Sequence, residues 1–371
     1  MGGEASGSVT RSVAPEEHHP TAAPPTGRYR ILQVHPSRFC NLTCRHCYSE
    51  SSPTERSAID VSVLSAAISD AAALGYSTLA ISGGEPFLYS GLATMLQTAR
   101  AQGMTATVTT NGTVFTERRV AQVQGLVDLI AISLDGVPSS HNLMRGSPRA
   151  FESMSARLDL LRQAHIPFGF IFTLTLHNVH ELAWVVEFAD AQGAKLIQVH
   201  PLEETGRAAS TLVGSRPDAV ECGYAFLEVI QLQERVGSRV KIQLDLTTGT
   251  RMVCERDSAS SVGAAEDTVA SFSDLVSPLV LEADGTAVPL TYGFPRSYAL
   301  GNIHREPLLS LAPHWLRTRA RSFQQVCDRV QRRLGNRKHV AMVNWYEMVA
   351  AAAAKAPGAH AADRDSPSRR T

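Results

Sequence analysis

The stretch Arg38-Phe-Cys40-Asn-Leu-Thr-Cys44-Arg-His-Cys47-Tyr48 carries the most specific signal in this sequence. Its cysteines are spaced C-x3-C-x2-C, which brings three thiolates round one corner of a cubic iron–sulfur cluster and leaves the fourth iron without a protein ligand. A cluster held by four cysteines is suited to electron transfer, whereas an open iron can bind a substrate or cofactor directly. The spacing therefore predicts a [4Fe–4S] cluster with a chemical role, bound by Cys40, Cys44 and Cys47.

Two simpler explanations compete for these cysteines. A structural zinc site usually has four ligands, and the fourth would here be His46 or a distant residue. Unrelated buried thiols would not be expected to gather within eight positions, and the remaining cysteines are scattered at Cys222, Cys254 and Cys327. The spacing favours the iron–sulfur cluster, while zinc stays open on this stretch alone.

A glycine-rich turn follows the next predicted strand. The strand Thr78–Ser82 is short, apolar and β-prone, and it ends in Gly83-Gly84-Glu85-Pro86. The two glycines let a ligand approach the backbone closely, and carbonyl groups at a strand end can accept hydrogen bonds from an ammonium group. We therefore expect Gly83, Gly84, Glu85 and Pro86 to contact a bound cofactor.

Taken together, the three cysteines, the aromatic Tyr48 and the Gly-Gly-Glu-Pro turn resemble the radical S-adenosylmethionine (radical SAM) superfamily. The resemblance implies that SAM binds the open iron through its methionine amino and carboxylate groups. It also implies that one electron from the cluster cleaves SAM to a 5′-deoxyadenosyl radical, which takes a hydrogen atom from the substrate. An external one-electron donor such as flavodoxin or ferredoxin is then an expected partner.

Length and charge fit an enzyme of this kind. A chain of 371 residues can bury a large core, and its 35 Lys and Arg balance its 35 Asp and Glu. This balance offers no electrostatic footprint for nucleic acid or an anionic membrane. No apolar run is long enough to cross a bilayer, and cluster assembly needs reduced thiols, so we expect a cytoplasmic protein.

Strands and helices are predicted to alternate between two tails. Residues 1–27 and 356–371 are rich in small, polar and Pro residues and are expected to be disordered. The predicted strands are Ile31–Val34, Thr78–Ser82, Thr105–Thr109, Val127–Ser133, Phe168–Leu174 and Lys195–His200. The predicted helices are Val61–Leu74, Leu92–Ala101, one from Thr116, Pro148–Ala164 and Glu181–Gln192.

Six strand–helix units with near-continuous apolar strands require a parallel sheet covered by helices. We therefore expect an α/β fold, an open (β/α)6 partial barrel like an incomplete TIM barrel, over residues 28–204. The family resemblance implies the same fold.

Polar motifs close the third and fourth predicted strands. Thr109-Thr110-Asn111-Gly112 follows one, and Ser133-Leu134-Asp135-Gly136 follows the other. Because ligands bind at the carboxyl ends of parallel strands, we expect Thr110, Asn111, Ser133 and Asp135 to join the Gly83–Pro86 turn in holding SAM. Each motif alone is also an ordinary turn.

An arginine after the fourth strand is a further candidate. In the family an arginine near this point pairs with the SAM carboxylate, and Arg145 in His141-Asn-Leu-Met-Arg145-Gly146 matches it. A planar guanidinium suits that task, although a surface arginine at a helix end would give the same pattern.

The fifth and sixth strands offer candidates whose role the sequence leaves open. Thr173 and Thr175 can hydrogen-bond SAM, and Val199 and Leu202 can pack on adenine, but ordinary core positions have the same periodicity. Four polar residues near these strand ends can reach a substrate or serve the surface or core: His177, Asn178, His200 and Glu203.

A different region begins near residue 205. Pro217–Val236 predicts an amphipathic helix and Val240–Leu244 a strand, residues 257–268 predict a loop, and Asp284-Gly285 within Pro278–Pro289 predicts a β-hairpin. A helical pattern over Leu308–Leu316 follows. This order resembles the SPASM/Twitch extension of radical SAM enzymes that modify peptides, which binds an auxiliary iron–sulfur cluster. We therefore expect a smaller α+β extension over residues 205–355.

The chain departs from that pattern after the hairpin. It reads Val288-Pro-Leu-Thr-Tyr-Gly-Phe294 where the family usually has a cysteine, and its remaining cysteines are too widely spaced for a cluster site. We expect a degenerate extension that has no auxiliary cluster and shapes the substrate pocket.

Several functions remain compatible with these features. A radical SAM enzyme that modifies a ribosomally made peptide fits the resemblance of both parts of the chain. A radical SAM enzyme acting on a sugar or nucleoside intermediate of specialised metabolism is the alternative. A non-catalytic iron–sulfur or zinc protein is a third hypothesis, but a merely structural site gains nothing from an open coordination position.

Overall fold

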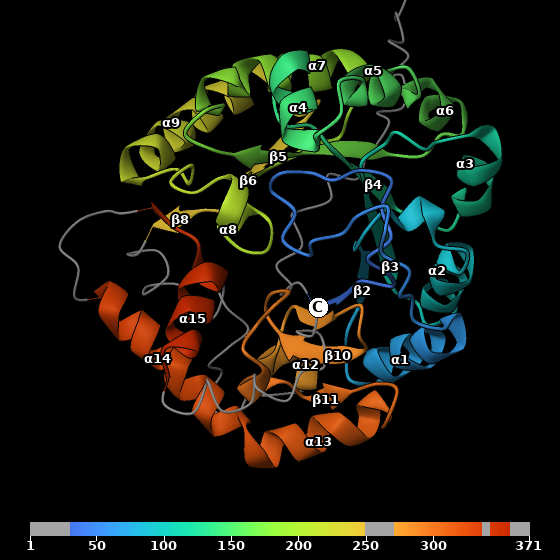
Figure 1. Ribbon diagram of the computed structural model, residues 1–371, viewed down its shortest axis with the longest axis vertical. Helices are drawn as coiled ribbons and strands as arrows, with labels where there is room; N and C mark the ends of the chain where they lie inside the picture. Colours follow the sequence, from blue (N-terminus) through green and yellow to red (C-terminus); the bar gives the residue numbers. More distant parts are fainter. Residues whose placement is uncertain (1–29, 249–270, 336–341, 357–371) are drawn as a thin grey trace, which may run out of the picture.

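The structure is a computed structural model that describes residues 30–248, 271–335 and 342–356. One sheet of ten strands runs in the order β11-β10-β9-β1-β2-β3-β4-β5-β6-β7. Figure 1 shows this sheet curling into an open ring with helices along its outer side. Its edges are β7 and β11, so the barrel stays open and the predicted partial, TIM-like barrel is confirmed.

Six parallel strands in chain order form the centre of the sheet. Side chains alternate between its faces: on β6, Ile197 and Val199 are buried in the core, whereas Gln198 and His200 point to the opposite, inner face. The bounds agree with the predicted ones to within two residues: β1 (Ile31–Val34), β2 (Thr78–Ile81), β3 (Thr105–Thr110), β4 (Leu129–Ser133), β5 (Phe168–Leu174) and β6 (Leu196–Pro201).

Helices on the outer face begin where the sequence offers capping residues. The carboxylate of Asp60 accepts the Ser62 N–H at 2.8 Å, and the Thr116 hydroxyl accepts the Arg119 N–H at 3.3 Å. The helices that follow the core strands are α1 (Val61–Ala73), α2 (Leu92–Ala101), α3 (Glu117–Val123), α5 (Ala150–Ser155), α6 (Leu158–Gln163) and α7 (Leu182–Gln192). Short 3-10 turns lie at η1 (Pro86–Leu88) and η2 (Val179–Glu181).

Within the six strand–helix units, one predicted helix is wrong and one helix was missed. The helix expected over Pro148–Ala164 is split into α5 and α6, which bury one continuous apolar stripe of Ala150, Met154, Leu158 and Leu161. Because this spacing continues across the break, the sequence gives no sign of it. Helix α4 (Pro138–Arg145) begins at a proline and ends at Gly146, whose φ of +64° is the left-handed conformation typical of a helix end.

The C-terminal part extends the same sheet at both edges. Strand β7 (Lys241–Leu244) is parallel to β6, and β9 (Leu279–Leu281) is parallel to β1. The predicted hairpin is confirmed, because β9 pairs antiparallel with β10 (Thr286–Pro289), which pairs with β11 (Gly301–Asn302). A small second sheet joins β8 (Thr247–Thr248) and β12 (Met342–Val343). Since one sheet runs through both parts, the boundary near residue 204 stays a prediction.

Helices of this part pack outside the sheet and across its open side (Figure 1). They are α8 (Ala208–Thr211), α9 (Ala219–Val236), α12 (Phe272–Leu275), α13 (Leu308–Thr318), α14 (Ala320–Gly335) and α15 (Trp345–Ala354), with a 3-10 turn at η4 (Arg296–Tyr298). The predicted loop at residues 257–268 and both predicted tails lie outside the described residues, apart from residue 356. Within the described ranges, no helix is long and apolar enough to cross a membrane.

Candidate functional site

The cysteine loop leaves the carboxyl end of β1 and is held by backbone hydrogen bonds. Cys40 and Cys44 are buried and Cys47 is partly exposed, and all three are free thiols. The Cys40 N–H donates to the carbonyl of Ser52 at 3.1 Å, and the Cys47 N–H donates to that of Cys44 at 3.3 Å. Three thiols therefore project from one short, fixed loop at the carboxyl edge of the sheet.

The segment before α8 holds the cysteine loop in place, a contact that the sequence did not predict. The Arg207 guanidinium donates to the carbonyls of Cys44 at 2.7 Å and Ser51 at 2.8 Å, and its backbone N–H donates to that of Cys47 at 3.0 Å. A side chain on Gly206 would begin 2.3 Å from the Tyr48 carbonyl oxygen. Arg207 is some 160 residues from its partners, so no local motif identifies it.

The close approach at Gly84 is made by the cysteine loop itself. A Cβ atom there would lie 2.0 Å from the carbonyl oxygen of Phe39, and one on Gly83 would lie 2.8 Å from that of Ser37. The Gly84 N–H also donates to the Ser37 carbonyl at 2.8 Å. In this structure the backbone of Phe39, the residue before Cys40, occupies the space that a side chain on Gly84 would need. Contacts from the carbonyls of this turn to SAM stay a prediction.

Glu85 ties two strand ends together. Its buried carboxylate accepts hydrogen bonds from the Thr110 hydroxyl at 2.7 Å, the Asn111 N–H at 2.9 Å and the Phe87 N–H at 3.1 Å. Burial raises the pKa of Glu85, and the hydrogen bonds to its carboxylate oppose that rise. The Glu85 carboxylate therefore joins the end of β2 to the end of β3, and we call it a bracket between these strands. The sequence predicted a contact between Glu85 and SAM but not this structural role. Pro86 follows it as the first residue of η1.

Asn111 connects this bracket to the cysteines. Its side-chain amide lies 3.8 Å from the Cys40 sulfur and donates to the Asn41 side chain at 3.0 Å. Its amide oxygen accepts from Thr113. An N–H group near a cluster sulfur is one of the features that set a cluster's reduction potential. The structure thus places Asn111 beside Cys40, one of the predicted iron ligands.

A buried charged network lies behind Cys44. Asp135 is fully buried, and one carboxylate oxygen lies 2.7 Å from Arg145 Nε. A guanidinium nitrogen of Arg145 is 3.8 Å from the Cys44 sulfur. Two histidines flank Asp135, His46 at 3.6 Å and His141 at 3.9 Å. Burial opposes ionisation of Asp135, but the Arg145 guanidinium outweighs it and lowers the pKa of this carboxyl.

This network brings together residues that the sequence proposed separately and two histidines whose place beside Asp135 it did not predict. Arg145 is buried in α4, so the alternative of a surface arginine is wrong. Ser133 is buried at the end of β4, two residues before Asp135. His46 and His141 stood inside the quoted motifs, but nothing in their spacing marked them as partners of one carboxylate.

The polar atoms of the site favour a bound polar cofactor. Asp135 and Arg145 satisfy each other, but among the described residues Nδ1 of His46 and Nε2 of His141 are buried without a hydrogen-bond partner. Buried polar groups are normally paired, so these two ring nitrogens in the network behind Cys44 fit a polar ligand such as SAM beside the cysteines. In this part of the chain no three His, Cys, Asp or Glu side chains converge on one ion. A cubic cluster needs no such convergence, because each thiolate binds a different iron.

The candidates on the fifth and sixth strands separate into two groups. Val199 packs in the main core, and Leu202 packs in a small cluster with Met144, Ala208 and Leu212, so both are core positions. Thr175 and Asn178 bond to each other at 2.9 Å, and Asn178 also donates to the Asp135 carbonyl at 3.1 Å. The remaining candidates, which lie on the inner face or in the loop after a strand, are Thr173, His177, His200 and Glu203.

His200 lies between two carboxylates. Its Nδ1 is 3.0 Å from Asp245, which follows β7, and its Nε2 is 3.6 Å from Glu203. Burial lowers the pKa of an imidazole, but the two carboxylates outweigh it and raise the pKa of His200 to about 10. The Glu203 carboxylate also accepts from the Asn344 amide at 3.3 Å, which connects the group to the N-terminus of α15.

The C-terminal part reaches the cysteine loop through an aromatic cluster. The ring of Tyr292, which follows β10, lies 5.5 Å from that of Tyr48 and 4.7 Å from that of His35. The Tyr48 hydroxyl is 3.0 Å from that of Ser82, the residue after β2. Tyr292 therefore stands in the segment where the family usually has a cysteine, and it packs beside the cysteine loop.

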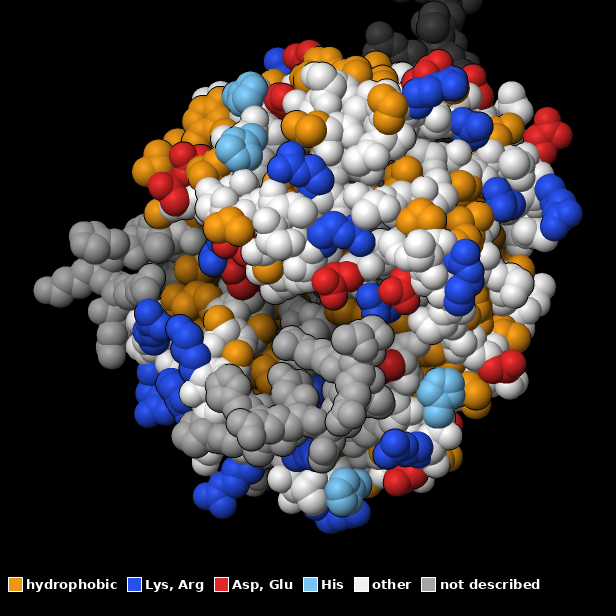
Figure 2. Space-filling model, viewed as in Figure 1, with side chains coloured by type: hydrophobic (Ala, Val, Ile, Leu, Met, Phe, Trp, Pro, Cys, Tyr) orange, Lys and Arg blue, Asp and Glu red, His pale blue; other side chains and the backbone are white. Residues whose placement is uncertain are grey.

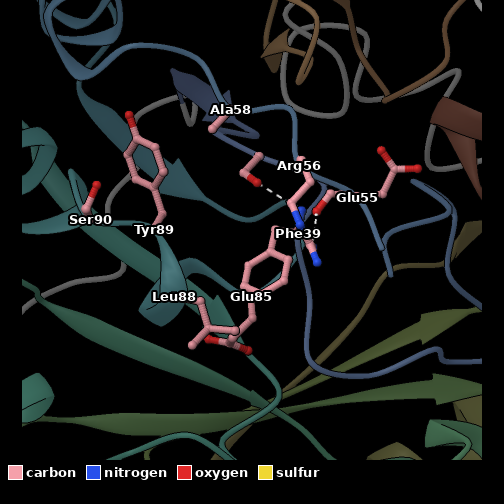
Figure 3. A pocket seen from close by; sticks show the side chains of 9 residues that line it. Phe39, Glu55, Arg56, Ala58, Glu85, Leu88, Tyr89 and Ser90 are labelled. Carbon is pink, nitrogen blue, oxygen red and sulfur yellow. Dashed lines mark hydrogen bonds between the residues drawn. The ribbon is translucent and has the colours of Figure 1, made fainter. Parts of the chain in front are cut away.

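A separate pocket of about 270 Å³ opens beside Phe39 (Figure 3). Figure 3 shows Phe39 between Arg56 and the pair Leu88 and Glu85. The Arg56 guanidinium lies 5.3 Å from the centre of the Phe39 ring. Neither the cysteines nor the β4 residues line it, and Glu85 is the one candidate cofactor residue that does.

Comparison with known proteins finds a matching family model and several relatives. Residues 34–189 match the model of the Radical SAM superfamily. The chain is 31% identical over 185 residues to the AdoMet-dependent heme synthase of Methanosarcina barkeri, a match that covers 49% of this chain and 53% of that protein. It is 25% identical over 197 residues to the sporulation killing factor maturation protein SkfB of Bacillus subtilis, covering 53% and 46%. The chain spans about half the length of the curated relatives it matches.

Solved structures share the fold over more of the chain. Native anSMEcpe with bound AdoMet superposes with a TM-score of 0.60 at 18% identity, covering 87% of this chain and 96% of that one. Streptococcus suis SuiB bound to S-adenosylmethionine gives 0.60 at 14%, covering 76% and 65%. Residues 34–189 therefore form a radical SAM domain, and enzymes of this superfamily use a [4Fe–4S] cluster and SAM.

Proposed function

We propose that this chain cleaves SAM at a [4Fe–4S] cluster on Cys40, Cys44 and Cys47 and uses the reaction to modify a ribosomally made peptide. When bound, the cluster supplies the electron that cleaves SAM to a 5′-deoxyadenosyl radical, which takes a hydrogen atom from the substrate. The observation that carries the proposal is the fixed three-thiol loop beside a buried charged network in which His46 and His141 each keep an unpaired ring nitrogen.

The chain's own residues have distinct tasks in this proposal. Cys40, Cys44 and Cys47 would hold the iron as thiolates, and the first two are buried. Asn111 and Arg145 place N–H groups against two of the sulfurs, which makes the cluster easier to reduce. Asp135 orients Arg145, so that its guanidinium can also pair with the SAM carboxylate. Arg207 keeps the loop in position.

The peptide substrate is supported by the C-terminal part. Tyr292 reaches the ring of Tyr48 beside Cys47, so this region can contribute to the substrate pocket. The relative SkfB is named as a maturation protein, and other anSMEcpe structures in the same fold contain bound peptides. An extension of SPASM/Twitch type without an auxiliary cluster is part of this proposal: Cys222 and Cys327 are buried in α9 and α14, and Cys254 lies outside the described residues.

A tetrapyrrole substrate is the second candidate. Several matched relatives at 28–31% identity are named as heme, pre-heme or coproporphyrin synthases. Others are named as a GTP cyclase and a nucleotide dehydratase, which keeps the nucleoside alternative in view. In each case a soluble one-electron donor such as flavodoxin or ferredoxin would reduce the cluster in the cytoplasm.

The substrate class can be tested by the stimulation of SAM cleavage. Anaerobically reconstituted enzyme with dithionite and SAM would be given, in parallel, peptides encoded beside its gene, coproporphyrin III and a nucleoside triphosphate. We expect a peptide to increase 5′-deoxyadenosine formation and to change in mass. Stimulation by the porphyrin or nucleotide alone would overturn the peptide proposal, and no 5′-deoxyadenosine in any reaction would overturn SAM cleavage itself.

A further inference from the structure

Helix α9 has a second apolar face that its own chain does not cover. Its inner residues Cys222, Ala225, Leu232 and Val236 are buried. Eleven large hydrophobic side chains are exposed among the described residues, and five of them belong to this one helix: Val220, Tyr224, Leu227 and Ile230 on its outer side and Phe226 on its flank. Helices that are apolar on more than one side are normally buried, and contiguous exposed apolar surface marks an interaction site.

The outer face has the spacing of a helix-pairing surface. Val220, Gly223, Leu227 and Ile230 follow one another at intervals of three, four and three residues, which places them along one seam. Val220 is 74% exposed, Leu227 61% and Ile230 43%. Gly223 interrupts the seam with a notch, because a Cβ atom there would have no heavy atom within 4 Å. Tyr224 flanks the seam.

This seam is complementary to itself. If a second α9 lies antiparallel to the first with the two-fold axis at residue 225, Leu227 of each chain faces Gly223 of the other, and Val220 faces Ile230. A protruding leucine then enters an open notch twice, by symmetry. The antiparallel arrangement also opposes the dipoles of the two helices.

We propose that the outer face of α9 is the interface of a two-fold symmetric homodimer. Most closed homo-oligomers are such dimers, in which one patch pairs with itself. Figure 1 places α9 at the outer edge of the ring, and Figure 2 shows hydrophobic side chains gathered at the same edge. The pairing therefore leaves the cysteine loop and the inner face of the sheet accessible.

The test is the molar mass of the full reconstituted chain by sedimentation equilibrium. A chain of 40.0 kDa should sediment at twice that mass. Leu227→Glu places two buried charges against the notches and should sediment as a monomer. Gly223→Leu fills the notch without adding charge and should weaken the dimer at least tenfold. Leu316→Glu is the matched control, because Leu316 is 39% exposed on α13 and should leave the dimer intact.

Iron content and circular dichroism of each variant show that it is folded. Wild type at 40.0 kDa at every concentration would overturn the proposal. A folded Leu227→Glu variant that stays dimeric would also overturn it, because the copies would then pair through another surface. Loss of the dimer in Leu316→Glu as well would mean that added charge, and not the α9 seam, decides association.

Discussion

Replacing Gly84 by alanine should disrupt the cluster and not only SAM binding. The new Cβ atom would lie 2.0 Å from the Phe39 carbonyl oxygen and 2.5 Å from its carbonyl carbon. Ordinary contact begins at about 3.5 Å, so the two backbones must separate by roughly 1.5 Å. No side-chain rotation can relieve this overlap, since both partners are backbone atoms. Phe39 immediately precedes Cys40, so the first cluster ligand moves with it.

The size of this displacement decides the outcome. Metal–ligand distances tolerate changes of about 0.2 Å, far less than the required shift of roughly 1.5 Å. Overpacking by one methyl group typically costs about 1–3 kcal/mol, and a rigid backbone partner places this case at or above the upper end. We therefore expect Gly84→Ala to hold less than half of the iron of wild type after reconstitution.

The assay is iron and sulfide content after anaerobic reconstitution and desalting. Gly223→Ala is the matched control, since its Cβ atom meets nothing within 4 Å and alanine favours a helix. This control should retain wild-type iron. If Gly84→Ala also retained wild-type iron and lost only SAM affinity, the glycine would serve a ligand and the structural reasoning would be refuted.

Three further predictions address the bracket, the buried histidine and the other cysteines. Glu85→Gln leaves one buried N–H without an acceptor and should lower the free energy of unfolding in urea by about 1–3 kcal/mol. Glu85→Ala should lower it further, and an Ala variant as stable as wild type would contradict the role of Glu85 in joining β2 to β3. Because the pKa of His200 is raised from 6.5 to about 10, its contribution to stability is complete below pH 6.5, shrinks as the pH rises and is lost above about 10. The difference in unfolding free energy between wild type and His200→Gln should follow that course, and a difference that grows with pH would count against it. Replacing the cysteines outside the loop with alanine should leave iron content and 5′-deoxyadenosine formation near wild type, at about 1 kcal/mol of stability per buried thiol; loss of a large part of the iron would reveal a second cluster at Cys222, Cys254 and Cys327.

Much of the fold could be predicted from the sequence because short-range patterns of apolar and turn residues determine it. Apolar strands with turn residues at their ends gave all six core strands and the hairpin to within two residues. The polar motifs after β3 and β4 were correctly placed at one edge, because parallel strands end together. Arg145 and Asp135 proved to be direct partners, a pairing that neither motif suggested by itself.

The features that were missed depend on contacts between distant segments. Position 84 requires a glycine because the backbone of Phe39 lies where a side chain would begin. Glu85 joins β2 to β3 through hydrogen bonds to the end of β3. Arg207 reaches the cysteine loop from beyond β6. The sheet also continues into the C-terminal part at both edges, which local propensity cannot indicate because strand pairing is decided by tertiary structure.

The central claim is that the three-cysteine loop holds the cluster that cleaves SAM. Its most direct test is iron content and 5′-deoxyadenosine formation, measured with dithionite and SAM, in wild type and in the variant with Cys40, Cys44 and Cys47 all changed to alanine. Wild type should hold about four irons and four sulfides per chain and form 5′-deoxyadenosine, while the variant should hold almost no iron and form none. A variant that kept about four irons, or that still cleaved SAM, would contradict the account.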